Sequence, residues 1–182
     1  MPVPVLVERV ALAAFRNHDV LALEPGSAPT VLLVGPNGAG KTSLLEALSL
    51  LVPGRGLRGA ALAEMARVPG PGGFAVAARL RPDPELPALE IRTGTRDVLG
   101  APTARRTLTL GGAPAPLSAL AQWHAQLWLT PAMDRLFHDG AAARRRFLDR
   151  LALALHPGHA GHAARYERAL AARGRLLAGE ER

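Results

Sequence analysis

Gly35-Pro36-Asn37-Gly38-Ala39-Gly40-Lys41-Thr42 matches the pattern G-x-x-x-x-G-K-[ST], and it constrains the fold more strongly than any other stretch of the chain. In such a loop the glycines let the backbone bend so that successive N–H groups point into one concavity. The helix that follows adds its N-terminal N–H groups and its dipole. Lys41 is expected to reach the β- and γ-phosphate oxygens, and the Thr42 hydroxyl to bind Mg²⁺. The stretch therefore predicts a loop that binds the phosphates of ATP together with Mg²⁺.

The use of lysine supports the same prediction. Lys41 is the only lysine in the chain, and arginine supplies the other basic side chains apart from histidine. A compact ammonium suits the end of a phosphate loop better than a forked guanidinium. We expect nucleotide contacts from the loop, from the residue after it and from an earlier turn. These residues are Gly35, Pro36, Asn37, Gly38, Ala39, Gly40, Lys41, Thr42, Ser43, Arg16 and Asn17, with Thr42 as the metal ligand. For Arg16 and Asn17, an ordinary surface turn explains the sequence equally well.

Length and composition narrow the class of protein. The chain has 182 residues, which suits one domain with a core, or a domain plus part of a second. Hydrophobic residues make up 48%, too many for a disordered chain, and the absence of cysteine excludes disulfides and thiolate metal sites. The apolar runs are too short to span a membrane and the first residues lack a signal peptide's basic stretch, so we expect a cytoplasmic location. The net charge of +7 favours contact with nucleic acid, although a GC-rich codon bias explains the arginines equally well.

The apolar pattern around the loop predicts an α/β arrangement. Residues 31–34 form a compact apolar run before the loop, which predicts a buried strand. Residues 41–51 predict an amphipathic helix that ends at Pro53-Gly54. Its inward face is predicted to carry Leu44, Leu45, Leu48 and Leu51. Further strands are predicted at residues 3–10, 20–23, 74–80, 88–92 and 106–110, the last three of them antiparallel.

The rest of the chain is mainly helical in pattern. Helices are predicted at residues 116–123, 141–155 and 159 to the end, and a strand at 126–129. The inward face of the helix at 141–155 is predicted to carry Phe147, Leu148, Leu151 and Leu155. We therefore predict an α/β P-loop NTPase domain of the ABC type with an antiparallel β region at residues 1–140. The start of a helical second lobe, apparently truncated, is predicted at residues 141–182.

Four further motifs point to one family of P-loop proteins. They are Phe15-Arg16-Asn17, Gly54-Arg55-Gly56-Leu57-Arg58, Leu129-Thr130-Pro131 and Arg144-Arg145-Arg146-Phe147-Leu148-Asp149. In this order and at these spacings, nearly the whole chain resembles roughly the N-terminal half of the RecF family of bacterial recombination proteins. The last motif is the one specific to RecF, because the first is shared with SMC and Rad50 relatives.

The resemblance implies an ABC-type ATPase head that binds ATP and Mg²⁺, binds single-stranded and gapped duplex DNA, and forms an ATP-dependent homodimer. It implies a role in recombinational repair at gapped DNA and stalled replication forks, in the DNA damage (SOS) response, with mediators of the RecO and RecR type and no membrane. Two alternatives stay open: the ATPase subunit of an ABC transporter, and a non-enzymatic fragment that binds nucleotide or nothing.

The chain departs from the family pattern in ways that bear on catalysis. Ala132 follows Pro131, where the family often has Glu. The sequence shows no apolar strand ending in Asp-Glu, no Ser-Gly-Gly-Gln signature and no switch histidine. These groups hold the metal, orient the attacking water and stabilise the leaving phosphate. We therefore predict that this chain binds ATP but does not hydrolyse it alone.

Other polar and aromatic residues are weighed against ordinary structural roles. Arg55 and Arg58 could line a phosphate or DNA surface, and at most two side chains of the run 144–146 could face DNA together. The more ordinary interpretation for all of them is a solvated surface. The same holds for the histidines, and a place in the core is expected for the tryptophans. These residues are His156, His159, His162, Trp123 and Trp128.

Overall fold

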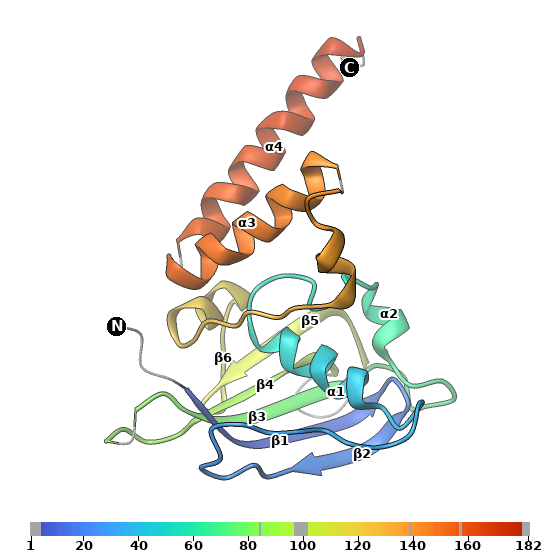
Figure 1. The fold of residues 1–182 in the computed structure, drawn as a ribbon, viewed down its shortest axis with the longest axis vertical. Coiled ribbons are helices and arrows are strands. Elements are labelled where there is room, and N and C mark those ends of the chain that lie inside the picture. The colour runs from blue at the N-terminus through green and yellow to red at the C-terminus, as the bar shows by residue number, and fades with distance from the viewer. Residues whose placement is uncertain (1–4, 84, 97–101, 139, 157, 180–182) are drawn as a thin grey trace. The chain divides into compact units, whose positions relative to one another are not determined.

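The computed structural model describes residues 5–83, 85–96, 102–138, 140–156 and 158–179 (Figure 1). The chain forms two compact units, Met1–His124 and Ala125–Arg182. The lobe boundary expected near residue 140 stays a prediction, because units defined by packing within this chain need not coincide with the lobes of a longer protein.

The first unit is built on one antiparallel sheet in the order β2-β1-β3-β4-β5-β6 (Figure 1). Its strands are β1 (Leu6–Phe15), β2 (His18–Leu23), β3 (Ala75–Arg81), β4 (Leu89–Arg96), β5 (Pro102–Leu110) and β6 (Ala113–Pro114). The inward face carries Leu12, Val76 and Ile91, all of them buried, and every second residue points away from it. The predicted antiparallel region is thus present, and β1 runs five residues past its predicted end, to the turn at Arg16 and Asn17.

One face of this sheet is covered by the helix that follows the phosphate loop (Figure 1). The helices of this unit are α1 (Lys41–Leu48), η1 (Ser49–Leu51), α2 (Leu62–Met65) and η2 (Leu117–Gln122). Leu44 and Leu51 pack on the sheet. The rings of Phe15 and Phe74 pack edge to face, with their centroids 5.1 Å apart. Leu45, predicted to face inward, is instead 50% exposed, because the buried stripe runs through Leu44 and Ala47.

The strand predicted at residues 31–34 is absent, and that prediction is wrong. The segment pairs with no described strand, and the side chains of Leu32 and Val34 are 83% and 82% exposed. Only Leu33 packs against the core. An apolar run becomes a strand only when a neighbour takes its backbone hydrogen bonds, and no described segment does so here.

The second unit is helical. It contains η3 (Pro131–Arg135), α3 (Ala141–Leu155) and α4 (His159–Leu177). The strand predicted at 126–129 is absent, so that prediction is wrong as well. Leu148 and Leu155, predicted to face inward, are 64% and 71% exposed, because within the unit α3 packs chiefly against α4, which covers only part of its circumference.

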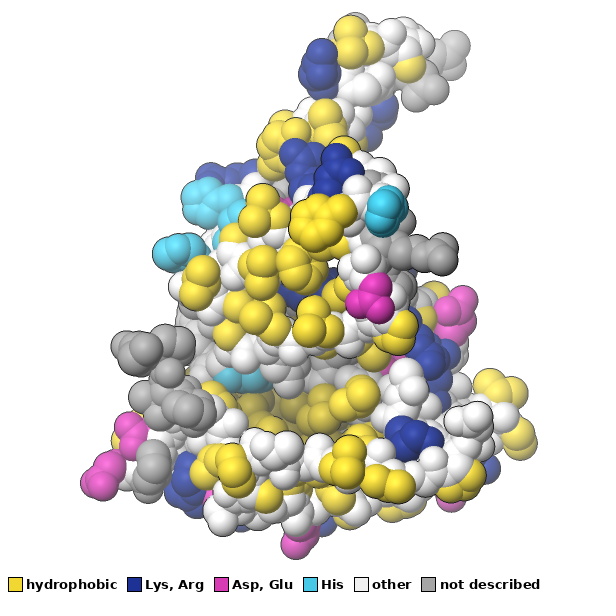
Figure 2. All heavy atoms as spheres, in the orientation of Figure 1, with side chains coloured by type: hydrophobic (Ala, Val, Ile, Leu, Met, Phe, Trp, Pro, Cys, Tyr) yellow, Lys and Arg dark blue, Asp and Glu magenta, His cyan; other side chains and the backbone are white. Residues whose placement is uncertain are grey.

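Apolar side chains therefore remain on the surface in both units. In the helical unit they include Leu170, Leu176 and Leu177. Figure 2 shows hydrophobic side chains (yellow) on the face of the molecule in view. Trp123, expected in the core, is 45% exposed, which corrects that expectation.

Candidate phosphate-binding site

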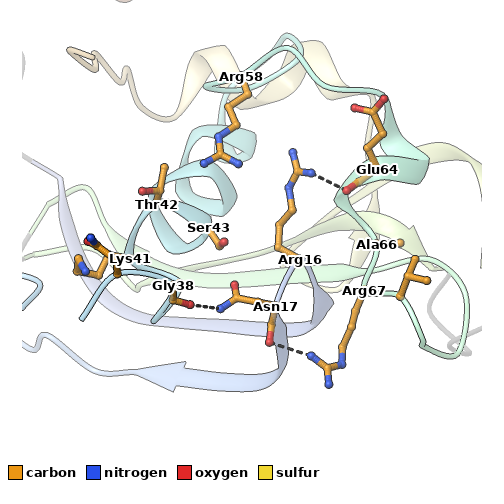
Figure 3. A pocket seen from close by; sticks show the side chains of 13 residues that line it. Arg16, Asn17, Gly38, Lys41, Thr42, Ser43, Arg58, Glu64, Ala66 and Arg67 are labelled. Carbon is orange, nitrogen blue, oxygen red and sulfur yellow. Dashed lines mark hydrogen bonds between the residues drawn. The ribbon is translucent and has the colours of Figure 1, made fainter. Parts of the chain in front are cut away.

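Three segments of the first unit enclose a pocket of about 760 Å³. They are the turn between β1 and β2, the phosphate loop with the first turn of α1, and the stretch that runs through α2 (Figure 3). The lining residues are Arg16, Asn17, Asn37, Gly38, Gly40, Lys41, Thr42, Ser43, Arg58, Glu64, Ala66, Arg67 and Val68. Eight of the eleven residues predicted to contact a nucleotide line this pocket; Gly35, Pro36 and Ala39 do not line it directly.

The loop is held from the side of the β1–β2 turn. Asn17 Nδ2 donates to the carbonyl oxygen of Gly38 at 3.1 Å, and His18 Nε2 lies 3.2 Å from the carbonyl oxygen of Gly40. A peptide plane carries its C=O and N–H on opposite sides, so the N–H of Lys41 points away from the turn. The turn thereby orients this part of the loop backbone.

Gly40 cannot be replaced without disturbing this contact. Its φ is +90°, in the left-handed region, and a Cβ there would overlap the ring of His18. Gly40 also caps α1, since its carbonyl oxygen accepts from the N–H of Leu44 at 3.0 Å. The second glycine of the motif is therefore required by backbone conformation and by packing.

The ammonium of Lys41 lies over the loop itself. Nζ donates to the carbonyl oxygens of Gly35 at 2.7 Å and Pro36 at 2.8 Å. No carboxylate of a described residue forms an ion pair with it. The hydroxyls of Thr42 and Ser43 belong to the same wall (Figure 3). This end of the pocket combines a cation, hydroxyl groups and a helix N-terminus, which is the chemistry that binds phosphate.

Arg16 lines the pocket but is bonded to its wall. Its Nε and Nη2 donate to the two carboxylate oxygens of Glu46 at 2.8 and 2.6 Å, and Nη1 donates to the Glu64 carbonyl oxygen at 2.6 Å. The hydrogen bond with Glu46 raises the pKa of Arg16, which therefore stays charged. The backbone of Arg16 is left-handed, with φ +52°, and its N–H donates to the Met65 carbonyl oxygen at 2.8 Å. Such a strained residue persists because several contacts hold it.

Two other arginines complete the wall. Nη1 of Arg58 lies 3.7 Å from Glu46 Oε2, and the Arg58 side chain is 49% exposed. Arg67 Nη1 donates to the carbonyl oxygen of Asn17 at 2.8 Å (Figure 3). The sequence did not point to Glu46 or to residues 64–68. A glutamate among leucines on a helix, and a stretch without a motif, carry no signal of their own.

Several other residues that the sequence analysis considered do not line the pocket. Arg145 stacks on the ring of Tyr166 at 4.2 Å. His159 Nε2 lies 2.9 Å from Asp149 Oδ1, and the described residues contain no group of three or more His, Cys, Asp or Glu that could hold a metal ion. Arg55 is exposed, away from the pocket. Within the described residues, no helix combines the length and hydropathy that crossing a bilayer requires.

Comparison with known proteins shows what the chain is similar to. A family model described as an AAA domain matches residues 9–59, which include the phosphate loop. Among curated relatives named DNA replication and repair protein RecF, that of Mesorhizobium japonicum is 47% identical over 180 residues and that of Rhizobium rhizogenes 48% over 178. Each alignment covers 97% of this chain and 46% of the relative. The RecF of Caulobacter vibrioides is 47% identical over 172 residues, which are 92% of this chain and 43% of the relative.

Solved structures give the same result for the fold. One, described as the recombination mediator protein RecF-ATPrS in the RecFOR pathway, superposes with a TM-score of 0.78 at 22% identity, over 98% of this chain and 46% of that one. Another, described as RecF-ATP in the same pathway, has a TM-score of 0.76 at 23% identity, over 95% of this chain and 46% of that one. These matches confirm the α/β P-loop fold predicted from the phosphate loop. In sequence nearly the whole chain matches part of the RecF proteins, and it spans about half the length of the curated relatives that it matches.

Proposed function

We propose that this chain binds ATP with Mg²⁺ in the pocket at the N-terminus of α1. The observation that carries the proposal is the phosphate loop itself, with Lys41 unpaired by any described carboxylate and Thr42 beside it. The triphosphate would lie on the loop, and the base and ribose would extend toward Ala66, Arg67 and Val68 at the other end of the pocket (Figure 3). The solved relative described as RecF-ATP supports the choice of nucleotide.

The metal fits this site as part of the nucleotide. Mg²⁺ keeps several waters and is usually held by one or two protein oxygens plus substrate phosphates. The Thr42 hydroxyl can supply one such oxygen, and no preformed cage of carboxylates is required. Bound in this way, Mg²⁺ would neutralise charge on the phosphates, while the residues of the chain hold and orient them.

The wider role follows the relatives' names and is proposed on that basis. We infer that the intact protein acts in DNA replication and repair, as the relatives' names indicate. Binding to single-stranded and gapped duplex DNA is proposed from the resemblance of the sequence motifs to those of RecF. A place with RecO- and RecR-type mediators follows from the RecFOR pathway named for the solved relatives. An ATP-dependent homodimer and a cytoplasmic location, where the DNA lies, belong to the same proposal. Pull-down of RecO or RecR with the ATP-loaded protein tests the mediator part, and absence of both would contradict it.

The test of nucleotide binding is Lys41→Ala. The ammonium should contribute charge-assisted contacts of about 1.5–3 kcal/mol, so the variant should bind ATP about ten- to a hundredfold more weakly. Calorimetry measures both affinities, and equal values would refute the site.

Phosphate release by the parent chain should not exceed that of the variant. Hydrolysis needs a carboxylate that holds the metal and orients the attacking water, and the sequence shows no apolar strand ending in Asp-Glu. Turnover of about one per minute that vanishes in the variant would contradict this second expectation.

A further inference from the structure

We infer that Glu46 is a positioning residue of the phosphate pocket, although its own side chain has no access to a ligand. The inference rests on the nucleotide site proposed above. Glu46 is 0% exposed and lies on α1 one helical turn after Thr42, so the two residues share a helix face. Its backbone is therefore rigidly linked to the phosphate loop, while its carboxylate points to other segments.

The carboxylate joins three separate parts of the pocket wall. Both oxygens accept from Arg16 in the β1–β2 turn, a two-bond geometry that fixes direction as well as distance. The same turn holds the loop carbonyls through Asn17 and His18. The remaining guanidinium nitrogen of Arg16 holds the Glu64 carbonyl. Glu46 thus ties the loop helix to the turn beneath the loop and to the opposite wall.

The two arginines beside Glu46 have different roles in this arrangement. Each of the three guanidinium nitrogens of Arg16 donates one hydrogen bond to the wall, which fixes the side chain in place. Arg58 has a single ionic contact among the described residues, at 3.7 Å, and it is half exposed at the pocket. Glu46 therefore holds one cation firmly against the pocket wall and contacts the other only loosely.

Glu46→Gln separates positioning from electrostatics, because the two predict opposite results. Loss of one negative charge close to the phosphates would by itself strengthen binding of an anion. Loss of the two-bond contact should loosen the turn and the loop and weaken binding. We expect ATP affinity to fall about fivefold or more, the change that corresponds to ~1 kcal/mol, in calorimetry well below the melting temperature.

The matched control is Glu8→Gln. Glu8 also bridges two arginines, Arg79 and Arg81, but on β1 away from the pocket. The Glu8→Gln variant should have a lower melting temperature than the parent and the same affinity for ATP. Arg16→Lys, which keeps the charge but not the fork, should weaken binding as Glu46→Gln does. The double variant Arg16→Lys with Glu46→Gln should bind ATP about as weakly as either single variant, since both substitutions break the same contact.

The possible outcomes separate the two proposals. If Glu46→Gln binds ATP as tightly as the parent while Lys41→Ala binds weakly, the positioning role is wrong and the nucleotide site stands. If the parent itself binds no better than Lys41→Ala, both are wrong. Should Glu46→Gln fail to fold by circular dichroism, Arg16→Lys decides, and parent-like affinity there would overturn the inference.

Discussion

Both ring nitrogens of His124 are buried, and neither has a hydrogen-bond partner in the described part of the chain. Burial disfavours the charged form and lowers its pKa from 6.5 to about 4. An unfolded chain would take up a proton near pH 6.5, whereas the folded chain resists it until about pH 4. The imidazole therefore makes no pH-dependent contribution to stability above pH 6.5, and destabilises the fold progressively as the pH falls below it.

The expected result is a loss of stability between pH 6.5 and 4 of up to ~3 kcal/mol from this residue alone. His124→Gln, which cannot take up a proton in this range, should flatten that part of the curve. Urea denaturation at a series of pH values measures the difference between the variant and the parent. Parallel curves for the two proteins would show that His124 does not titrate as described.

At the scale of single residues, the motif predicted what is local. Lys41 and Gly40 could be identified because phosphate binding demands a particular side chain and a particular backbone conformation at fixed spacing. Glu46 could not, because its partner Arg16 lies 30 residues away and the pairing depends on a turn in the left-handed conformation. For Arg16 the sequence left a nucleotide contact and an ordinary surface turn equally open, and it did not indicate what the side chain would bond to.

Among the elements, the segment from α1 to η1 is anchored at both ends. Its start rests on the β1–β2 turn. Its far end is held by Arg106 of β5, which donates to the carbonyl oxygens of Leu50 and, at 2.8 Å, of Gly54, and to Thr93 Oγ1 at 2.9 Å. A cation at a helix C-terminus is favourable, and this one has no carboxylate partner among the described residues. Burial lowers its pKa to about 10, so it remains charged near neutral pH.

Arg106→Gln should therefore destabilise the protein by about 2 kcal/mol, since it leaves the part-buried carbonyl of Leu50 and the carbonyl of Gly54 without their charged donor. Arg92→Gln on the neighbouring strand is the matched control, because Arg92 is exposed on the other face of the sheet and should cost little. Chemical denaturation measures both. Equal, small losses in the two variants would mean that Arg106 does not hold the helix end.

The elements also show where pattern reasoning stops. The helices α1, α3 and α4 begin at their predicted residues, because a helix completes its hydrogen bonds within itself. The strands at 31–34 and 126–129 failed because a strand needs a partner, which a local apolar run cannot supply. The same limit explains Leu148 and Leu155, whose burial depends on what lies beside α3.

For the whole molecule, the property to test is charge. The chain carries a net charge of +7, which favours polyanions without choosing among DNA sequences. Not all of its arginines are available: Arg145 stacks on Tyr166, and Arg16 and Arg106 serve the fold. The net charge can be counted from the sequence, but the sequence does not show which side chains remain free to meet phosphate.

If the arginine excess binds DNA, affinity should fall steeply with salt, by about 0.7–0.9 decades per decade of salt for each phosphate contact. Fluorescence anisotropy with two unrelated oligonucleotides of equal length should give similar slopes and affinities. Lys41→Ala should bind DNA as the parent does in the absence of nucleotide. An affinity for DNA that does not change between about 50 and 200 mM salt would contradict the electrostatic account.

Because the only lysine of the chain lies on the phosphate loop, reactions at its amine can be used to measure whether the pocket is occupied. An amine-selective acylating reagent has two kinds of target in this chain, the α-amino group and Lys41 Nζ. A protease that cleaves after lysine has one possible cut, inside the loop. Acylation of Lys41 and cleavage after it both need access to the pocket, so a bound nucleotide should slow them. Their rates therefore report occupancy of the pocket in the parent sequence, without a substitution.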